Sequence, residues 1–259
     1  MSLPSRALIL AVQNLVHTKA DGDPQDLTWR AIYKALTGTD WKEPTAATLP
    51  TGSVEGFPAE ALHLILDAEG VDQPSKWPGG NSGITLGYGC DIGADPASLE
   101  FWRGILPDDQ IATLAQAKGK TGLDAKQIAT RFVGIKVTQE QALEVFIKKS
   151  LPVEIAKTKQ TYPGIDIFPK SVLGAMTSIT YNRGTDLDWN ERDGNRREEL
   201  RAIYGIIKRE AETPEVERDI PAACQRIAAQ IRNMKRLWVG KGLDGLLARR
   251  DAEAALVTA

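Results

Sequence analysis

One glycine-rich stretch, NSGITLGYGCDIG at residues 81–93, limits the folds that this chain can adopt. From residue 84 on, apolar or aromatic side chains alternate with small or polar ones, which is the period of a β-strand. Glycine is a poor residue for a strand interior, so a single extended strand does not explain the stretch. We predict instead that Gly87-Tyr88-Gly89 is the turn of a β-hairpin, because glycine readily adopts the positive φ angles of such turns.

The predicted hairpin brings two polar side chains together. Thr85 and Asp91 are six residues apart in sequence and would lie about 20 Å from each other on a straight strand. In the hairpin they become cross-strand neighbours, with Cβ atoms about 5 Å apart. We expect the Asp91 carboxylate to accept hydrogen bonds from the Thr85 hydroxyl and from a water molecule. The alternative is a plain turn in which the aspartate bonds its own backbone.

The rest of the chain after residue 57 shows helical spacing of its apolar residues. Proline suits the first turn of several predicted helices, and Thr138 with Gln141 matches a capping box. We therefore predict an α+β fold that is mainly α, with one small β element. The expected helices are Pro58–Glu69, Ala97–Trp102, Pro107–Gln116, Asp124–Arg131, Gln139–Lys159, Pro169–Tyr181, Arg196–Arg209, Ile220–Met234 and Gly242–Ala255.

Changes in composition divide the chain into three parts. Residues 1–40 hold short amphipathic segments on either side of the turn sequence KADGDPQD, which predicts a small helical module. Residues 41–57 are rich in Gly, Thr and Pro without periodicity, which is typical of a linker. Residues 58–259 then form the larger domain.

Composition argues against several classes of protein. A net charge of −2 gives no electrostatic case for a nucleic-acid partner, and no apolar run is long enough for stable membrane insertion. The two cysteines, Cys90 and Cys224, and the two histidines fit neither a metal site nor a Ser-His-Asp triad. We expect no metal and no cofactor, and we expect the protein to be a monomer.

An acidic residue interrupts the apolar face of the helix at residues 58–69. Glu69 falls at i+7 from Leu62 and at i+4 from Ile65, on the stripe that faces the core. Partial desolvation raises the pKa of a carboxyl group, which can then deliver a proton as a general acid. The alternative is a helix cap or an ion pair at an interface. Together with Thr85 and a second carboxylate, Asp91, the set points toward glycoside hydrolysis.

The stretches LDAEG, at residues 66–70, and WPGGNSGITLGYGCDIG, at residues 77–93, resemble the phage-type lysozymes, in particular the pesticin-like branch that includes many phage endolysins. In that branch a helix-end Glu is followed by a glycine-framed Thr and then by an Asp six residues later, as in Glu69, Thr85 and Asp91. The stretches AMTSITYNRGTDL and AQIRNMKRLWVGKGLDGLLARRDAEAAL are similar to the helical lobe of these enzymes. The resemblance implies a lysozyme-like fold over residues 58–259, with a small hairpin lobe and a larger helical lobe.

The same resemblance implies an endolysin-type N-acetylmuramidase that cleaves the β-1,4 bond between N-acetylmuramic acid and N-acetylglucosamine of bacterial peptidoglycan. Glu69 would protonate the glycosidic oxygen, while Asp91 and Thr85 would position and activate the attacking water. T-even phage lysozymes place the second carboxylate before the threonine. The only acid there in this chain is Asp72, which is too close to Glu69 in sequence, so we choose Asp91. Residues 1–40 more faintly resemble a peptidoglycan-binding module. Their alternative role is a helical hairpin packed on the catalytic body.

A further group of residues near the predicted cleft are candidates for substrate contact. A Trp77 indole can stack on a sugar face, although a core position beneath a loop explains it equally well. The helix that ends before Gly184 would present polar groups to the cleft, and Arg183 would meet a peptide or lactyl carboxylate. Asn182 alternatively caps that helix. The candidates are Trp77, Tyr88, Tyr181, Asn182 and Arg183.

Two other functions stay open at this point. A lytic transglycosylase needs only one catalytic carboxylate, so Asp91 argues against it. A non-catalytic cell-wall-binding or virion structural protein could keep the fold without activity. For the muramidase we expect synthesis in the host cytoplasm, and action in the periplasm or cell wall after holin- or secretion-dependent release.

Overall fold

The computed structural model describes residues 56–68, 70–190 and 194–259. The chain divides into two units, Met1–Thr51 and Gly52–Ala259, and all described residues belong to the second. The predicted module at residues 1–40, most of the predicted linker at residues 41–57, and Glu69 lie outside the described residues.

The described part of the chain is mainly helical and contains one two-stranded antiparallel sheet, which confirms the predicted class, α+β and mainly α. Among its residues, no helix combines the length and the apolar character needed to cross a lipid bilayer. The sheet is formed by β1 (Thr85–Leu86) and β2 (Cys90–Asp91). The α-helices are α3 (Ala59–Ala68), α4 (Asp108–Leu114), α5 (Gly122–Ile128), α6 (Gln139–Val145), α7 (Leu151–Thr161), α8 (Lys170–Arg183), α9 (Glu198–Glu212), α10 (Ile220–Asn233) and α11 (Asp244–Val257).

Short 3₁₀ segments connect these helices. The predicted helix at residues 97–102 is one of them. It begins with a proline after the capping residue Asp95 and has 3₁₀ turns throughout. The 3₁₀ segments are η1 (Pro96–Trp102), η2 (Ala115–Ala117), η3 (Ala129–Phe132), η5 (Ile165–Ile167), η6 (Gly194–Arg197), η7 (Glu215–Glu217) and η8 (Met234–Leu237).

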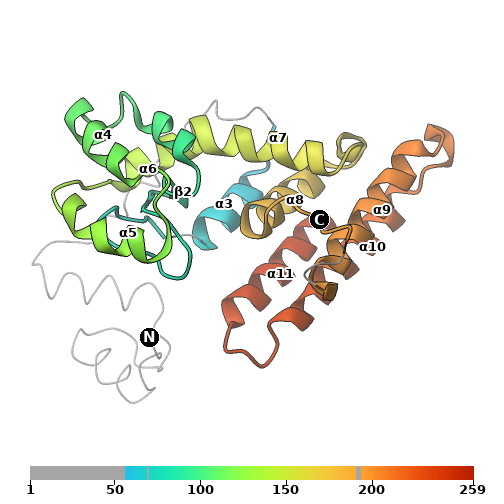
Figure 1. Ribbon diagram of the computed structural model, residues 1–259. Helices are drawn as coiled ribbons and strands as arrows, with labels where there is room; N and C mark the ends of the chain where they lie inside the picture. Colours follow the sequence, from blue (N-terminus) through green and yellow to red (C-terminus); the bar gives the residue numbers. More distant parts are fainter. Residues whose placement is uncertain (1–55, 69, 191–193) are drawn as a thin grey trace, which may run out of the picture. The chain divides into compact units, whose positions relative to one another are not determined.

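Helices α8 to α11 form the main core, at the right of Figure 1. α10 packs against both α9 and α11, and α11 packs against α8. Ile203 and Ile207 on α9, with Ile227 and Ile231 on α10, are all fully buried. A spacing of four residues places each pair on one face of its helix, so the two apolar stripes meet in the core.

Helix α3 joins this core by packing on α8 and α11. Leu62 and Ile65 are buried, whereas His63 and Asp67 are exposed, as the helical spacing predicts. α3 ends at Ala68, so the predicted acid Glu69 directly follows the helix.

The prediction of one regular helix over residues 139–159 is wrong. α6 and α7 are separated by a π-helical turn, η4, which spans Phe146–Ser150. Pro152 in the first turn of α7 has no N–H to donate to the preceding turn, which interrupts the regular hydrogen-bond ladder. A single π turn absorbs such an interruption without ending the helix. The apolar period continues through it, so sequence periodicity alone does not reveal the turn.

Candidate functional site

The predicted hairpin is present in the structure. β1 and β2 pair antiparallel, with Thr85 directly opposite Asp91. Gly87 and Gly89 have φ angles of 59° and 68°, the positive values that such a turn requires. The predicted cross-strand pairing of Thr85 with Asp91 is therefore confirmed.

The Asp91 carboxylate is held by three backbone N–H groups. Gly83 N donates to Oδ2 at 2.8 Å, while Gly93 N and Ala94 N donate to Oδ1 at 3.0 and 2.9 Å. The Thr85 hydroxyl instead lies 3.5 Å from the carbonyl oxygen of Gly83. The expected hydrogen bond from Thr85 to Asp91 is wrong, because backbone amides on both sides of the hairpin occupy the carboxylate.

Gly83 and Gly93 allow two backbone segments to approach closely. A Cβ on Gly83 would lie 2.2 Å from Asp91 Oδ1 and 2.5 Å from the Cα of Gly93. A Cβ on Gly93 would lie 2.2 Å from the carbonyl oxygen of Lys120. These glycines therefore bring the N–H donors to the carboxylate, a role that we did not predict. In the sequence these two glycines are part of a run of glycines along the hairpin. Such a run does not show which glycine forms a turn and which allows two backbone segments to approach closely.

Backbone hydrogen bonds tie the segment after α3 to the hairpin turn. Asp72 N donates to Gly87 O at 2.7 Å, and Gly87 N donates to Asp72 O at 2.9 Å. The Gln73 amide is bonded twice to the backbone of Val137, at 2.8 and 3.0 Å. These bonds fix the path of the chain from α3 to the hairpin, so the end of α3 and the hairpin belong to one local structure.

Two tyrosines connect the hairpin to α8. The Tyr181 hydroxyl donates to the carbonyl oxygen of Tyr88. Both rings lie edge-on to Phe146, with centroids 5.7 and 5.9 Å from its ring. Tyr88 is only 7% exposed, and its ring packs the hairpin onto the helices. Tyr88 and half-buried Tyr181 both line a cavity of about 190 Å³ together with Gly89 and Asp91.

We predict that Gly89→Ala weakens this connection. An alanine there would keep a φ near 68°, and its Cβ would lie 2.5 Å from the Tyr181 hydroxyl. We expect the free energy of unfolding to fall by about 2 kcal/mol. Gly104→Ala is the matched control, because its φ is 77° but nothing lies within 4 Å of an added Cβ. The control should cost only about 1 kcal/mol. Urea denaturation measures both, and equal losses would contradict a contribution from the Tyr181 contact.

The other substrate-contact candidates lie around the hairpin and the end of α8. Half-buried Trp77 donates its indole N–H to Ser82 O at 2.9 Å, and Lys126 Nζ lies 5.6 Å from the ring centroid. Asn182 is exposed. Trp77 therefore closes the loop before the hairpin, while Asn182 is accessible to a ligand.

Arg183 lies among other arginines where α8 ends. Its Nη2 donates to the carbonyl oxygen of Arg196, and its guanidinium lies 5.4 Å from the centroid of the Trp238 ring. Burial, followed by the neighbouring charge of Arg197, lowers the pKa of Arg183 to about 10. Arg183 therefore fixes the end of α8, in a region that holds both arginines and the acid Glu199.

A buried ionic cluster fixes α11 on α8. Glu253 Oε1 accepts from the Ser178 hydroxyl at 2.6 Å and from Arg250 Nη2 at 2.8 Å. Arg249 Nη2 also donates to the Ser178 hydroxyl, at 3.1 Å. Burial raises the pKa of the Glu253 carboxyl, an effect that the two guanidinium groups oppose. Because α8 also carries Tyr181, the cluster supports the helix that contacts the hairpin.

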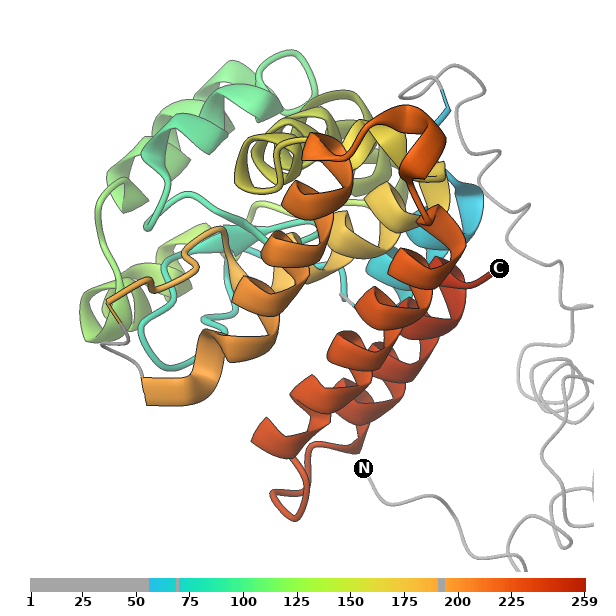
Figure 2. The same cartoon turned by 90° about the vertical axis from the view of Figure 1, so that its right-hand side faces the viewer.

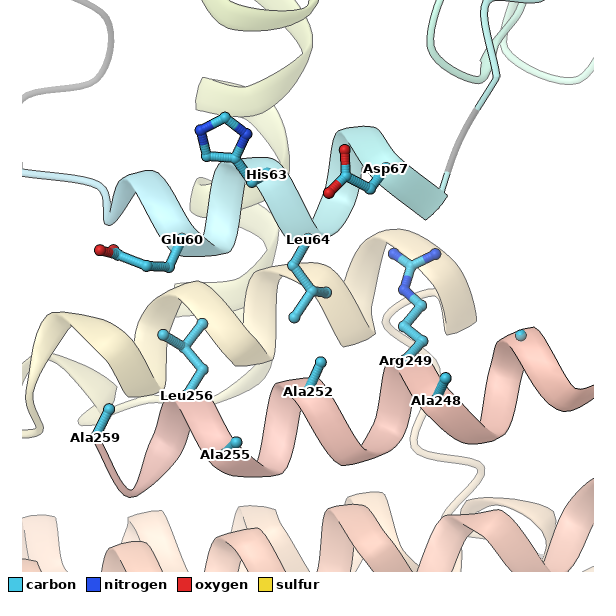
Figure 3. Close-up of a pocket in the computed structure, with 11 residues that line it drawn as sticks. Glu60, His63, Leu64, Asp67, Ala248, Arg249, Ala252, Ala255, Leu256 and Ala259 are labelled. Atoms are coloured by element: carbon cyan, nitrogen blue, oxygen red, sulfur yellow. The ribbon is translucent and has the colours of Figure 1, made fainter. Parts of the chain in front are cut away.

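A larger cavity, of about 770 Å³, lies between α3 and α11. Figure 3 shows Leu64, Ala252 and Leu256 along this groove, with Asp67 and Arg249 at one end. The walls are mostly small or apolar side chains, and the polar side chains do not converge on one point as they do in a catalytic site. The hairpin, rather than this groove, is therefore the candidate site.

Comparison with protein-family models finds no family that matches the chain. Comparison with curated proteins finds no matching relative either. The function must therefore be argued from the residues and the geometry of the site.

Proposed function

We propose that this protein is a peptidoglycan muramidase with a lysozyme-like fold, which cleaves the β-1,4 bond between N-acetylmuramic acid and N-acetylglucosamine and thereby lyses bacteria. One observation carries the proposal. The backbone pair of Asp72 with Gly87 joins the chain just after Glu69 to the turn between Thr85 and Asp91.

Chain connectivity keeps Glu69 near Asp72, and Asp72 pairs with the hairpin turn. Glu69 precedes Asp72 by three residues, so its Cα lies within about 11 Å of the Asp72 Cα. Glycosidases place their two carboxyl groups about 5 Å apart when a covalent intermediate forms, and about 6.5 to 9.5 Å apart when a water attacks directly. The connection at Asp72 is compatible with both separations.

The proposed mechanism divides the chemistry between the helix end and the hairpin. Glu69 protonates the glycosidic oxygen as the general acid. A carboxylate offers about four lone-pair sites, and three of those of Asp91 are taken by backbone N–H groups. The remaining site holds the attacking water, with Thr85 beside it on the paired strand. The amides keep the carboxylate fixed, so the water is positioned before the reaction begins.

The charge at the end of α8 fits this substrate. Peptidoglycan carries lactyl and peptide carboxylates along its glycan strands, and Arg183 lies at the end of α8, the helix whose Tyr181 contacts the hairpin. We propose that Arg183 attracts those carboxylates. In this account the protein acts in the periplasm or cell wall, after release by a holin or a secretion system.

The direct test is release of new reducing sugar ends from purified sacculi by the full chain. The proposal expects reducing ends to appear in step with the loss of turbidity. Binding to sacculi without any release of reducing ends would contradict it and would favour a cell-wall-binding protein.

We predict that Asp91→Asn lowers turnover by at least about 100-fold, because it weakens the group that holds the water. The amide would also direct an NH₂ group at a backbone N–H, which costs about 1–3 kcal/mol of stability. Turnover must therefore be measured well below the melting temperature of the variant. Asp109→Asn is the matched control, since this exposed side chain lies in the first turn of α4, outside the hairpin and the cavity that Asp91 lines. Near-normal turnover of Asp91→Asn would leave Asp72, or no second carboxylate, in the mechanism.

A further inference from the structure

The connection between α8 and α9 exposes a tryptophan. Trp189 is 60% exposed, although Leu187 and Asp188 just before it are only 7% and 3% exposed. Figure 2 shows this connection, in gold, projecting away from α8 before the chain turns back into α9.

The exposed indole is held in place from two sides. Its ring lies edge-on to Tyr204, with centroids 5.2 Å apart and an interplanar angle of 80°. Arg201 Nη1 donates to the carbonyl oxygens of Leu187 and Asp188, at 3.1 and 2.9 Å. Tyr204 therefore supports one side of the indole, and Arg201 holds the backbone that precedes it.

The backbone before the indole is strained. Asp188 has a φ of 49°, the only positive value among the described residues other than glycine. Its N–H donates to Asp186 Oδ1 at 2.8 Å, which closes a tight local turn. Such strain persists only where the surroundings impose it, and it is frequent at binding sites. Here it turns two residues inward and the next one, Trp189, outward.

Trp189 lies on the connection that follows α8, the helix whose Tyr181 contacts the hairpin. A sugar ring has an apolar C–H face that packs on an indole and a polar rim that stays in water. The neighbours Asp186 and Asn190 are exposed and polar, so they can bind the hydroxyl groups at the rim of a sugar.

Resting on the proposed muramidase function, we propose that Trp189, supported by Tyr204, is a stacking platform for a hexosamine ring of the glycan strand. The ring would bind outside the pair of sugars that flank the cleaved bond. Such a platform improves the binding of long strands and leaves the chemical step unchanged.

The test uses soluble glycan strands, freed of peptides by an amidase, as substrate for the full chain. Trp189→Ala should raise KM for long strands about tenfold, equivalent to about 1.4 kcal/mol, with kcat within about twofold of the wild type. Trp189→Phe should restore most of the affinity. Val216→Ala, at a side chain that is 93% exposed on η7, is the control and should change neither constant.

Binding of the same strands to the Glu69→Gln chain, with and without Trp189→Ala, separates this inference from the proposed function. Weaker binding caused by Trp189→Ala supports the platform even if the wild type does not hydrolyse the strands. Cleavage by the wild type with an unchanged KM in Trp189→Ala would overturn the platform alone. Absence of both binding and cleavage would overturn the platform and the muramidase together.

Discussion

Glu69→Gln should abolish lysis of bacterial walls while leaving the melting temperature unchanged or higher. Glutamine keeps the shape of the side chain but cannot protonate the glycosidic oxygen, and loss of a general acid costs about 100- to 10,000-fold in rate. The substitution removes only a charge and changes the side-chain volume little, so we expect no loss of stability. Release of reducing ends and thermal unfolding of the same sample measure the two effects.

Glu60→Gln is the matched control for this variant. It makes the same chemical change on the same helix, at an exposed position in the first turn of α3. The control should keep wild-type turnover and stability. Substantial residual activity of Glu69→Gln would remove Glu69 from the mechanism, whereas equal losses in both variants would point to damage to α3 as a whole.

Glu253→Gln should produce the largest loss of stability. Both Arg250 and Glu253 are fully buried, with Arg250 Nε 2.7 Å from Glu253 Oε2. Removing one partner of a buried pair leaves an uncompensated charge, which typically costs about 3–5 kcal/mol. The melting temperature should therefore fall by about 10 °C. Thermal unfolding followed by circular dichroism measures the change.

Asp251→Asn is the control, on the same helix and with the same type of substitution. Asp251 is half exposed and pairs with Lys235 at 2.7 Å, on the surface. Pairs of this kind contribute about 1 kcal/mol or less. A similar loss in both variants would contradict the role that we assign to the buried cluster.

The hairpin shows how far the sequence predicts the site. Alternation and glycine spacing correctly predict the turn at Gly87-Tyr88-Gly89 and the pairing of Thr85 with Asp91, because both depend on strand period alone. They do not predict which groups bind the Asp91 carboxylate. Its donors, Gly83 and Gly93 among them, are brought to it by close backbone approach, which depends on the tertiary fold.

Helix positions were similarly predictable, but their regularity was not. The predicted helix at residues 220–234 is α10, Ile220–Asn233, because its apolar period is strong. The π turn at Phe146–Ser150 hardly changes the apolar period of the segment from α6 to α7, so the sequence does not predict it. The sequence around Tyr88 suits either a ligand contact or the core. In the structure the Tyr88 ring packs on Phe146 and also lines the cavity beside Asp91.

Mass spectrometry of the fragments that the full chain releases from purified peptidoglycan distinguishes hydrolysis from the other two functions. Hydrolysis should give muropeptides that end in a reducing N-acetylmuramic acid, formed by addition of water across the β-1,4 bond. Fragments that end in 1,6-anhydro-N-acetylmuramic acid would instead identify a lytic transglycosylase, and the absence of any soluble fragment would identify a wall-binding protein. Either result would contradict the assignment of Glu69, Thr85 and Asp91 as a hydrolytic site.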